Sequence, residues 1–315
     1  MDDKSYIIVM SRVVVVKASS ALSPAVLNKQ QYSLMLSAGI CLLTGDKGAA
    51  DALHRVLRGT KIGIKTNCLT RKANSTPVAL AEALSDHLIL AGSKPADLII
   101  WERSSRELSG AGYTLDASGS GLRCLGTDAN GVGYSADFYT SGDVNSLVTR
   151  ILTEMVEVNI NLPVLKDHSV AGLSAGMKNM YGAINNPNKY HADGCNPFCA
   201  HVSNLPPLKS KNRLTIIDAV RVQYNGGPGF VPNYLGYYGG ILISDDPVAV
   251  DRVGLEIVDH LRTSHQLPTL EKAQRPVKYL ETAQQIGLGI ADLAAIDLQV
   301  IEVDSEGRQR RTGMF

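Results

Sequence analysis

Short apolar runs and amphipathic stretches alternate along the chain of 315 residues. The apolar runs are rich in β-branched residues, which is typical of buried strands, and they cover residues 6–10, 12–18, 61–66, 97–101, 156–162, 214–217, 241–243 and 298–303. The stretches between them show helical spacing or helical composition, at residues 23–43, 46–57, 76–91, 143–155, 248–261 and 277–285. Residues 61–101 follow the order strand, helix, strand, and such a βαβ unit pairs its strands in parallel. The pattern therefore predicts an α/β fold with a mostly parallel sheet flanked by helices.

Two segments depart from this alternation. Residues 109–142 are rich in Gly, Ser and Asp, and we interpret them as an irregular excursion. Their glycine pairs neither follow a strand nor open a helix, so no dinucleotide cofactor is expected. The charged tail, residues 304–315, is expected to fray. We expect an N-terminal α/β half (1–150) with the βαβ unit and a C-terminal half (151–315), forming one compact unit with a cleft between them.

The bulk composition narrows the class of protein. Apolar residues make up 44% and charged residues 19% of the chain, as in soluble globular proteins. The formal net charge of +1 gives no electrostatic reason to expect a nucleic acid or an anionic membrane as partner. No apolar run approaches the roughly 20 residues that a membrane-spanning helix needs. The five cysteines are scattered, so we expect a reducing compartment, the cytoplasm by default, while export with a removed leader stays open.

Charged and polar residues follow five of the predicted strands. They are Lys65, Asn67 and Cys68, then Glu102 and Arg103, then Lys166, Asp167 and His168, then Asp218 and Arg221, and finally Asp245 and Asp246. In open parallel sheets, ligands bind beyond the carboxyl ends of the strands. The sequence therefore predicts a functional site at this edge, with most of its residues between positions 161 and 229.

Lysine, histidine and asparagine residues indicate what this site binds. The candidates for binding a small anionic substrate, through a carboxylate or phosphate group, are Lys65, Asn67, Lys178 and Asn179. Histidine is the usual proton-transfer group near neutral pH, and the candidates for catalysis are His168, His191 and Lys166. A solvated turn around His168 and a tightly packed helix around Lys178 are the structural alternatives.

Four donor side chains lie close together in the spacing His-x3-Cys-x3-Cys-x-His, which starts at His191. Such donors suit Fe, Zn, Cu or Ni, or an iron–sulfur cluster. With a carboxylate at a strand end, the candidate metal ligands are Cys195, Cys199, His201 and Asp218. The dipeptide Asn196-Pro197 predicts a helix start, which would lower the thiol pKa of Cys199 in the first turn. The spacing matches no standard zinc motif, so the alternative is one buried cysteine, one catalytic histidine and two uninvolved residues.

Several segments together resemble the family called domain of unknown function 362 (DUF362). They are Ile64-Lys65-Thr66-Asn67, Asn161-Leu162-Pro163-Val164-Leu165-Lys166-Asp167-His168, Gly176-Met177-Lys178-Asn179-Met180-Tyr181-Gly182, His191 with Gly194-Cys195-Asn196-Pro197, Leu214-Thr215-Ile216-Ile217-Asp218-Ala219, Gly226-Gly227-Pro228 and Asp246-Pro247-Val248-Ala249-Val250-Asp251. The resemblance extends over nearly the whole chain, and the activity of the family is largely unassigned. Some members carry ferredoxin-type cysteine clusters or a twin-arginine leader, and this sequence shows neither. A distant similarity to the nickel-pincer lactate racemase family is limited to the layout of residues 65–77.

Three classes of function follow from these observations. The first is a metal- or cofactor-dependent enzyme, an oxidoreductase or isomerase, that acts on a small anionic substrate. The alternative is a non-catalytic iron–sulfur or transition-metal protein for electron transfer or metal transport. The third is a binding or assembly module, with a homo-oligomer left open, because tyrosines common at contact surfaces lie among glycines at Tyr224, Tyr234, Tyr237 and Tyr238.

Overall fold

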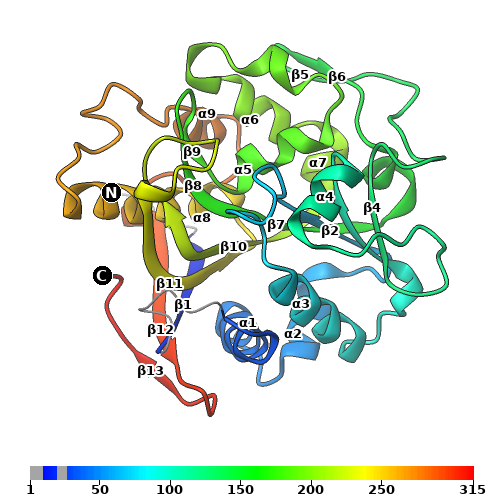
Figure 1. Ribbon diagram of the computed structural model, residues 1–315, viewed down its shortest axis with the longest axis horizontal. Helices are drawn as coiled ribbons and strands as arrows, with labels where there is room; N and C mark the ends of the chain where they lie inside the picture. Colours follow the sequence, from blue (N-terminus) through cyan, green and yellow to red (C-terminus); the bar gives the residue numbers. More distant parts are fainter. Residues whose placement is uncertain (1–9, 20–26) are drawn as a thin grey trace, which may run out of the picture.

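The computed structural model describes residues 10–19 and 27–315. Within them, one sheet of eleven strands has a continuous path in the spatial order β13 (Gln309–Arg311), β12 (Ile296–Val303), β1 (Ser11–Ala18), β11 (Leu235–Ser244), β10 (Asn212–Gln223), β7 (Val158–Leu162), β2 (Ile62–Thr66), β3 (Leu98–Glu102) and β4 (Arg123–Gly126). The remaining two strands, β8 (Val164–His168) and β9 (Gly172–Ser174), branch from β10. A separate hairpin consists of β5 (Tyr139–Ser141) and β6 (Val144–Ser146). Strands from both halves of the chain therefore enter the same sheet (Figure 1).

Most neighbouring strands in this sheet run parallel. β10, β7, β2, β3 and β4 pair in parallel in succession, and so do β1 and β12. β11 lies antiparallel between β1 and β10, so the sheet is mixed. The predicted α/β fold with a mostly parallel sheet flanked by helices is confirmed.

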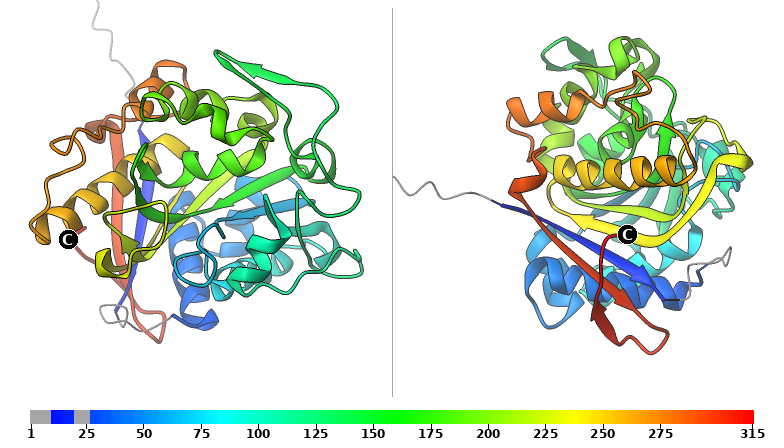
Figure 2. Two further views of the ribbon diagram at one scale, coloured as in Figure 1. Left: turned by 45° about the horizontal axis from the view of Figure 1, so that its top comes forward. Right: turned by 90° about the vertical axis from the view of Figure 1, so that its left-hand side faces the viewer.

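Alternate strand residues enter two hydrophobic cores, one on each face of the sheet. Along β1, Val13 and Val15 belong to one core, and Val14 and Val16 belong to the other. The core of Val14 is covered by α1 (Lys29–Thr44), α2 (Ala49–Leu57) and α3 (Val78–Leu90). The core of Val13 is covered by α6 (Phe198–Ser203), α7 (Pro206–Lys211), α8 (Pro247–Ser264) and α9 (Tyr279–Gln285) (Figure 2). Helices on both faces explain why the strands are apolar on both sides.

Side chains that the sequence places at helix ends cap the helices. The Asp246 carboxylate accepts hydrogen bonds from the N–H groups of Val248 and Ala249 at the start of α8. Gly45 ends α1 with a φ of 78°, a conformation that glycine adopts without steric cost. The helix start expected near residue 23 lies outside the described residues, as does most of the strand expected at 6–10, and α1 begins after Asn28 in a capping box.

Three expectations differ from the observed structure, and the first concerns the irregular excursion expected at 109–142, which contributes strand β4 to the main sheet beside β3. The helix expected at 143–155 is wrong in its first part, because Val144 and Ser146 point into the core from strand β6, and only Ile151–Met155 is helical. The tail does not fray throughout, because β13 pairs with β12 and Arg310 forms an ion pair at 2.8 Å with Glu302 of that strand. In each case the observed strand forms by pairing with another strand, and the local sequence pattern does not encode that pairing.

Candidate functional site

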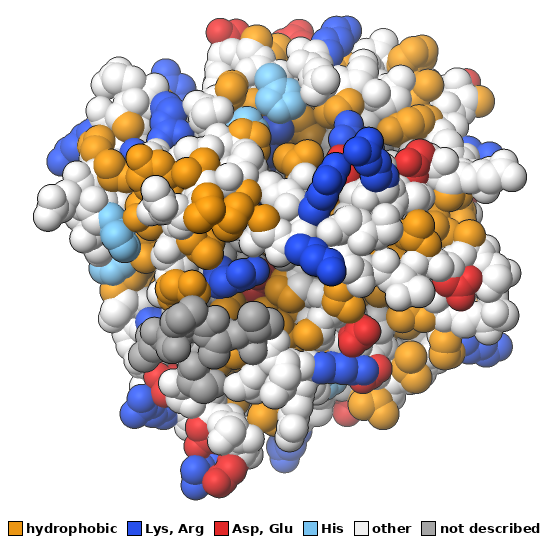
Figure 3. Space-filling model, in the orientation of Figure 1, with side chains coloured by type: hydrophobic (Ala, Val, Ile, Leu, Met, Phe, Trp, Pro, Cys, Tyr) orange, Lys and Arg blue, Asp and Glu red, His pale blue; other side chains and the backbone are white. Residues whose placement is uncertain are grey.

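A cavity of about 260 Å³ lies beyond the carboxyl ends of β2, β3 and β8. Six of the proposed site residues line it: Lys65, Asn67, His168, Lys178, Asn179 and His191. Lys166 lies beside it, because its Nζ donates to Asn67 Oδ1 at 3.0 Å. On the face shown in Figure 3, lysine and arginine side chains gather near the middle. The edge of the sheet that the sequence indicated thus carries a cavity built from both halves of the chain.

Lys65 is held in a buried ion pair at this cavity. Its Nζ donates to Glu102 Oε1 at 2.7 Å and to the carbonyl of Thr66 at 2.6 Å. The Glu102 carboxylate also accepts the backbone N–H groups of Cys68 and Arg103. Because the pair is electrically neutral and fully bonded, Lys65 shapes the cavity and adds no net charge to it.

An amide network connects Lys166 to the cavity wall. Asn67 accepts from Lys166 through Oδ1 and donates through Nδ2 to Asn179 Oδ1 at 3.1 Å. Asn179 in turn donates to Asn161 Oδ1 at 2.8 Å. Burial is the main cause that lowers the pKa of Lys166 to about 8, while the negative charge of Glu102 opposes the shift and the Lys178 and Lys65 cations add to it. Lys166 is therefore a buried cation whose position depends on one hydrogen bond.

Replacing Lys166 with Met is expected to raise the free energy of unfolding at pH 7 by about 1–2 kcal/mol. A pKa that falls from 10.5 to about 8 makes burial of the ammonium cost about 3 kcal/mol. Loss of the bond to Asn67 offsets about 1 kcal/mol of the gain. Because the pKa is lowered, Lys166 loses its proton at a lower pH in the folded state than in the unfolded state. The free energy of unfolding of the wild type therefore rises between about pH 8 and 10.5, and the difference in stability between the variant and the wild type shrinks. Urea unfolding at pH 7 and pH 10 measures both effects, and a variant less stable than the wild type at pH 7 would contradict them.

Lys178 and His191 form a hydrogen-bonded pair in the cavity wall. Lys178 Nζ lies 3.0 Å from His191 Nε2 and 3.4 Å from the centre of the Tyr181 ring. His191 Nδ1 lies 3.0 Å from the carbonyl of Pro187, so Nδ1 carries the ring proton and Nε2 presents its lone pair to Lys178. Burial lowers the pKa of Lys178, and burial together with the Lys178 cation lowers the pKa of His191. The pair therefore joins the Lys178 ammonium to a neutral imidazole through one hydrogen bond.

His168 is a neutral imidazole with a fixed tautomer. Its Nδ1 accepts hydrogen bonds from the N–H groups of Val170 at 3.2 Å and Ala171 at 3.1 Å, which leaves the ring proton on Nε2. Burial and then the positive charge of Lys178 lower the pKa of His168 to about 3. Its ring stacks on His191 with the centroids 5.8 Å apart. His168 thus offers an N–H donor to the cavity at neutral pH.

Asp251 positions the short helix α5 (Gly176–Asn179) that carries Lys178. Its two carboxylate oxygens accept the N–H groups of Gly176 at 2.7 Å and Met177 at 2.9 Å. Sequence reasoning did not assign Asp251 or Tyr181 to the site. A signal was present for Asp251, since it is a carboxylate on the apolar face of a helix and is buried there.

The four candidate metal ligands do not form one cluster in the fold. Asp218 accepts from the hydroxyl of Tyr32 at 3.3 Å and so faces the core that α1 covers. His201 lies beside Ser141 of the β5–β6 hairpin. The two remaining candidates, Cys195 and Cys199, are buried in the opposite core. Among the described residues, no three His, Cys, Asp or Glu side chains are grouped so that they could hold a metal ion.

The prediction of a lowered thiol pKa at Cys199 is wrong. Cys199 does lie in the first turn of α6, after the cis peptide bond between Asn196 and Pro197. It is completely buried, and this burial raises the pKa of its thiol well above the usual value. Desolvation outweighs the dipole of a helix of only six residues.

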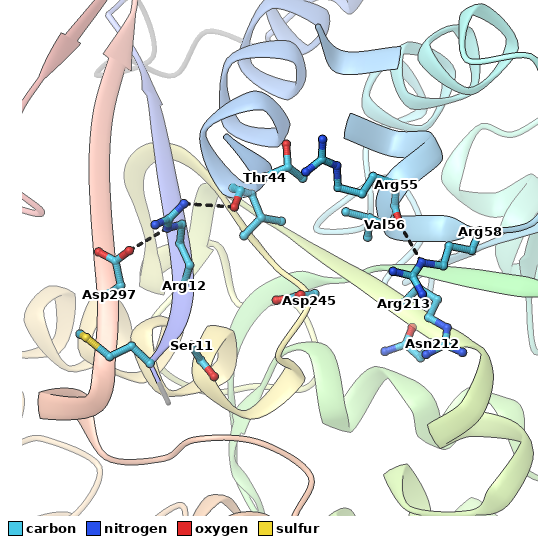
Figure 4. Close-up of a pocket in the computed structure, with 12 residues that line it drawn as sticks. Ser11, Arg12, Thr44, Arg55, Val56, Arg58, Asn212, Arg213, Asp245 and Asp297 are labelled. Carbon is cyan, nitrogen blue, oxygen red and sulfur yellow. Dashed lines mark hydrogen bonds and ion pairs between the residues drawn. The ribbon is translucent and has the colours of Figure 1, made fainter. Parts of the chain in front are cut away.

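A larger hollow of about 980 Å³ lies at the opposite edge of the sheet (Figure 4). The charged residues that line it are Arg12, Arg55, Arg58, Arg213, Asp245 and Asp297. Arg12 pairs with Asp297 at 2.7 Å, and Arg55 pairs with Asp46. The described residues that line this hollow include no histidine, lysine or cysteine. The smaller cavity is therefore the better candidate for chemistry.

Comparison with known proteins places the chain in a family. The family model of the domain of unknown function 362 (DUF362) matches residues 62–256. The chain belongs to this family. All lining residues of the smaller cavity lie within the DUF362 match, from Lys65 to Pro228. The resemblance inferred from the sequence is thus confirmed, and the candidate site belongs to the part of the chain that defines the family.

Other comparisons add little about this DUF362 protein. No curated protein matches it. One solved structure that matches is a Thermotoga maritima protein determined by a structural genomics consortium, with 11% identity and a TM-score of 0.42. The match covers 76% of this chain and 60% of that one, so this chain spans less than two thirds of the other protein. Within the described residues, every helix is too short or too polar to cross a bilayer.

The tyrosines considered as a contact surface are mostly internal. Tyr224 and Tyr238 are buried, and Tyr224 packs edge-on against Tyr234 with the ring centroids 5.8 Å apart. Tyr237 is the member of the group with substantial exposure. Packing within the chain therefore accounts for much of this cluster.

Proposed function

We propose that this DUF362 protein is an enzyme that binds a small anionic molecule in the cavity and transfers a proton on it. The observation that carries the proposal is the convergence of Lys178, His191 and His168 on one cavity. Isomerisation is the reaction type that these groups support by themselves, because it needs a base, an acid and a donor to the substrate oxygen. Oxidoreduction would require a redox group in addition.

The charge of the cavity favours an anion. The Lys65–Glu102 pair is neutral, and Arg103 lies 2.7 Å from Glu107 in a second pair at the rim. Lys178 and the adjacent Lys166 have no carboxylate partner of this kind within the described residues. A substrate carboxylate would therefore replace the water that burial has removed from these two ammonium groups.

The hydrogen-bond pattern supports a division of roles. His168 Nε2–H would donate to a substrate carbonyl or carboxylate oxygen, where negative charge develops when a neighbouring carbon loses its proton. Passage of the Lys178 proton to His191 Nε2 would leave a neutral amine at Lys178, and this amine could accept the proton from the substrate carbon. The same amine, once protonated, returns a proton to the product. No other described side chain is needed for this exchange.

A metal or an iron–sulfur cluster fits the observed donors poorly. Cys195 and Cys199 both lie close enough to influence the Lys178 charge, but two thiols fall short of the three or four protein ligands usual for zinc or iron–sulfur sites. His201 and Asp218 lie elsewhere in the fold. We therefore assign no step of the proposed reaction to a metal.

Solvent exchange tests the proposal without knowledge of the natural substrate. The purified chain would be incubated in D2O with a panel of small 2-oxo acids, 2-hydroxy acids and amino acids, and deuterium incorporation followed by proton NMR. We expect exchange at the carbon beside the carboxylate or carbonyl for at least one member. Absence of both exchange and ligand-induced thermal stabilisation across the panel would remove the basis of the proposal.

A further inference from the structure

A second cavity, of about 360 Å³, lies at the N-terminus of α3. Its wall includes Tyr32 and Asp218, which places it beside the core covered by α1. The segment between β2 and α3 contributes to both cavities, with Asn67 lining the first and residues 71–72 and 75–77 lining the second. The proposed function assigns no role to this second cavity.

The first turn of α3 offers unused backbone donors to this space. α3 is a helix of 13 residues that begins after Pro77 without a side-chain cap. Among the described residues, the N–H groups of Val78 and Ala79 have no acceptor, whereas those of Leu80 and Ala81 bond to Pro77. Free N–H groups and the helix dipole together favour an anion at such an end.

A buried hydroxyl provides an independent sign of a ligand. Ser75 lines the cavity with only 7% of its surface exposed. Its Oγ has no hydrogen-bond partner within the described part of the chain. Buried hydroxyl groups are nearly always bonded, so this one requires a partner that the described residues do not supply.

Three cations surround the same space. Arg71, Lys72 and Arg221 line the cavity, and their charged groups form no hydrogen bond or ion pair with the described residues. One carboxylate, Asp218, opposes them; it accepts from Tyr32 and lies close enough to Arg221 to be influenced by its charge. Three positive groups against one negative group leave the cavity cationic.

We propose that this second cavity binds a phosphate-like oxyanion, either free or as the phosphate group of a larger molecule. The oxyanion would accept hydrogen bonds from the N–H groups of Val78 and Ala79 and from Ser75 Oγ. Arginine forks suit its oxygens, so Arg71 and Arg221 would bind two of them. The site does not depend on the reaction proposed for the cavity of Lys178.

Equilibrium dialysis of the full chain against labelled inorganic phosphate tests the proposal. We expect one bound phosphate with a Kd of about 1 mM or tighter. Arg71→Gln and Arg221→Gln should each weaken binding about tenfold, as expected for loss of a charge-assisted hydrogen bond. Val78→Pro should weaken it severalfold while keeping the helix, because proline is favoured at the first helical position and Pro77 already has a ψ of 134°.

Two control variants locate the bound phosphate. Arg213→Gln changes an arginine in the larger hollow at the opposite edge, and Lys189→Gln changes an exposed lysine outside both smaller cavities. Both should leave phosphate binding unchanged. Absence of binding, binding that ignores all three variants at the second cavity, or equal loss in either control would overturn the proposal.

Discussion

Replacing Asp167 with Ala is expected to lower the free energy of unfolding by about 3–5 kcal/mol. Asp167 is fully buried, and its carboxylate accepts Arg275 Nη1 at 2.7 Å and the N–H of Gly227 at 3.0 Å. A second guanidinium, that of Arg262, lies 3.6 Å away and is itself only 3% exposed. Removing the carboxylate takes away the larger of the two negative charges that act on this buried cation, while the penalty of desolvating it remains. Urea unfolding at pH 7 measures the loss.

An exposed ion pair serves as the matched control. Arg12 and Asp297 are also separated by 2.7 Å, but both side chains are partly open to solvent. Asp297→Ala is therefore expected to cost less than about 1 kcal/mol. Equal losses for the two variants would contradict the view that burial gives Asp167 its importance. Because Asp167 precedes His168 on β8, its replacement should also loosen the wall of the Lys178 cavity.

Replacing Lys178 with Gln is expected to reduce catalysed solvent exchange by a factor of about 10²–10⁴. The variant removes the group that both attracts the anion and carries the proton, while the fold stays intact because a buried cation is costly to retain. Lys178→Arg should keep part of the binding but lose the proton transfer, since an arginine side chain stays protonated. The measurement is the NMR exchange rate with the member of the panel that reacts fastest.

The matched control is a lysine near the cavity but outside it. Lys189 is exposed, with its Nζ 5.6 Å from the centre of the Tyr190 ring. Lys189→Gln should leave the exchange rate unchanged. An exchange rate in Lys178→Gln equal to that of the wild type would show that the proton moves by another route.

The hydrophobic pattern was sufficient for seven of the eleven strands of the main sheet, namely β1, β2, β3, β7, β10, β11 and β12, and for most of the longer helices. In β1, the period of two distributes successive valines between two cores, and the Asp246 cap follows from a local rule that needs no tertiary partner. The segment from 143 to 155 has helical composition, but tertiary pairing with β5 turns its start into a strand. Residues 309–311 form a strand because β12 offers an open edge, and no local signal encodes that partner.

Sheet geometry also determines which parts of the site could be predicted from the sequence. Polar residues at strand ends meet because parallel strands end at one edge, which brings Lys65 and His168 to the same cavity. Residues that are predicted to act together need not point to the same face of the sheet. Ile217 and Ala219 of β10 belong to one core and Ile216 to the other, so Asp218 points away from the cysteines.

The protonation states of His168 and His191 test the proposed proton transfer directly. Nitrogen-15 NMR of the labelled chain reports the tautomer and the pKa of His168 and His191 in the absence of any substrate. We predict that His168 keeps its proton on Nε2 and stays neutral down to about pH 4, since its pKa is about 3. We predict that His191 carries its proton on Nδ1. Titration of His168 near its ordinary value of 6.5 would contradict the arrangement on which the proposed proton transfer depends.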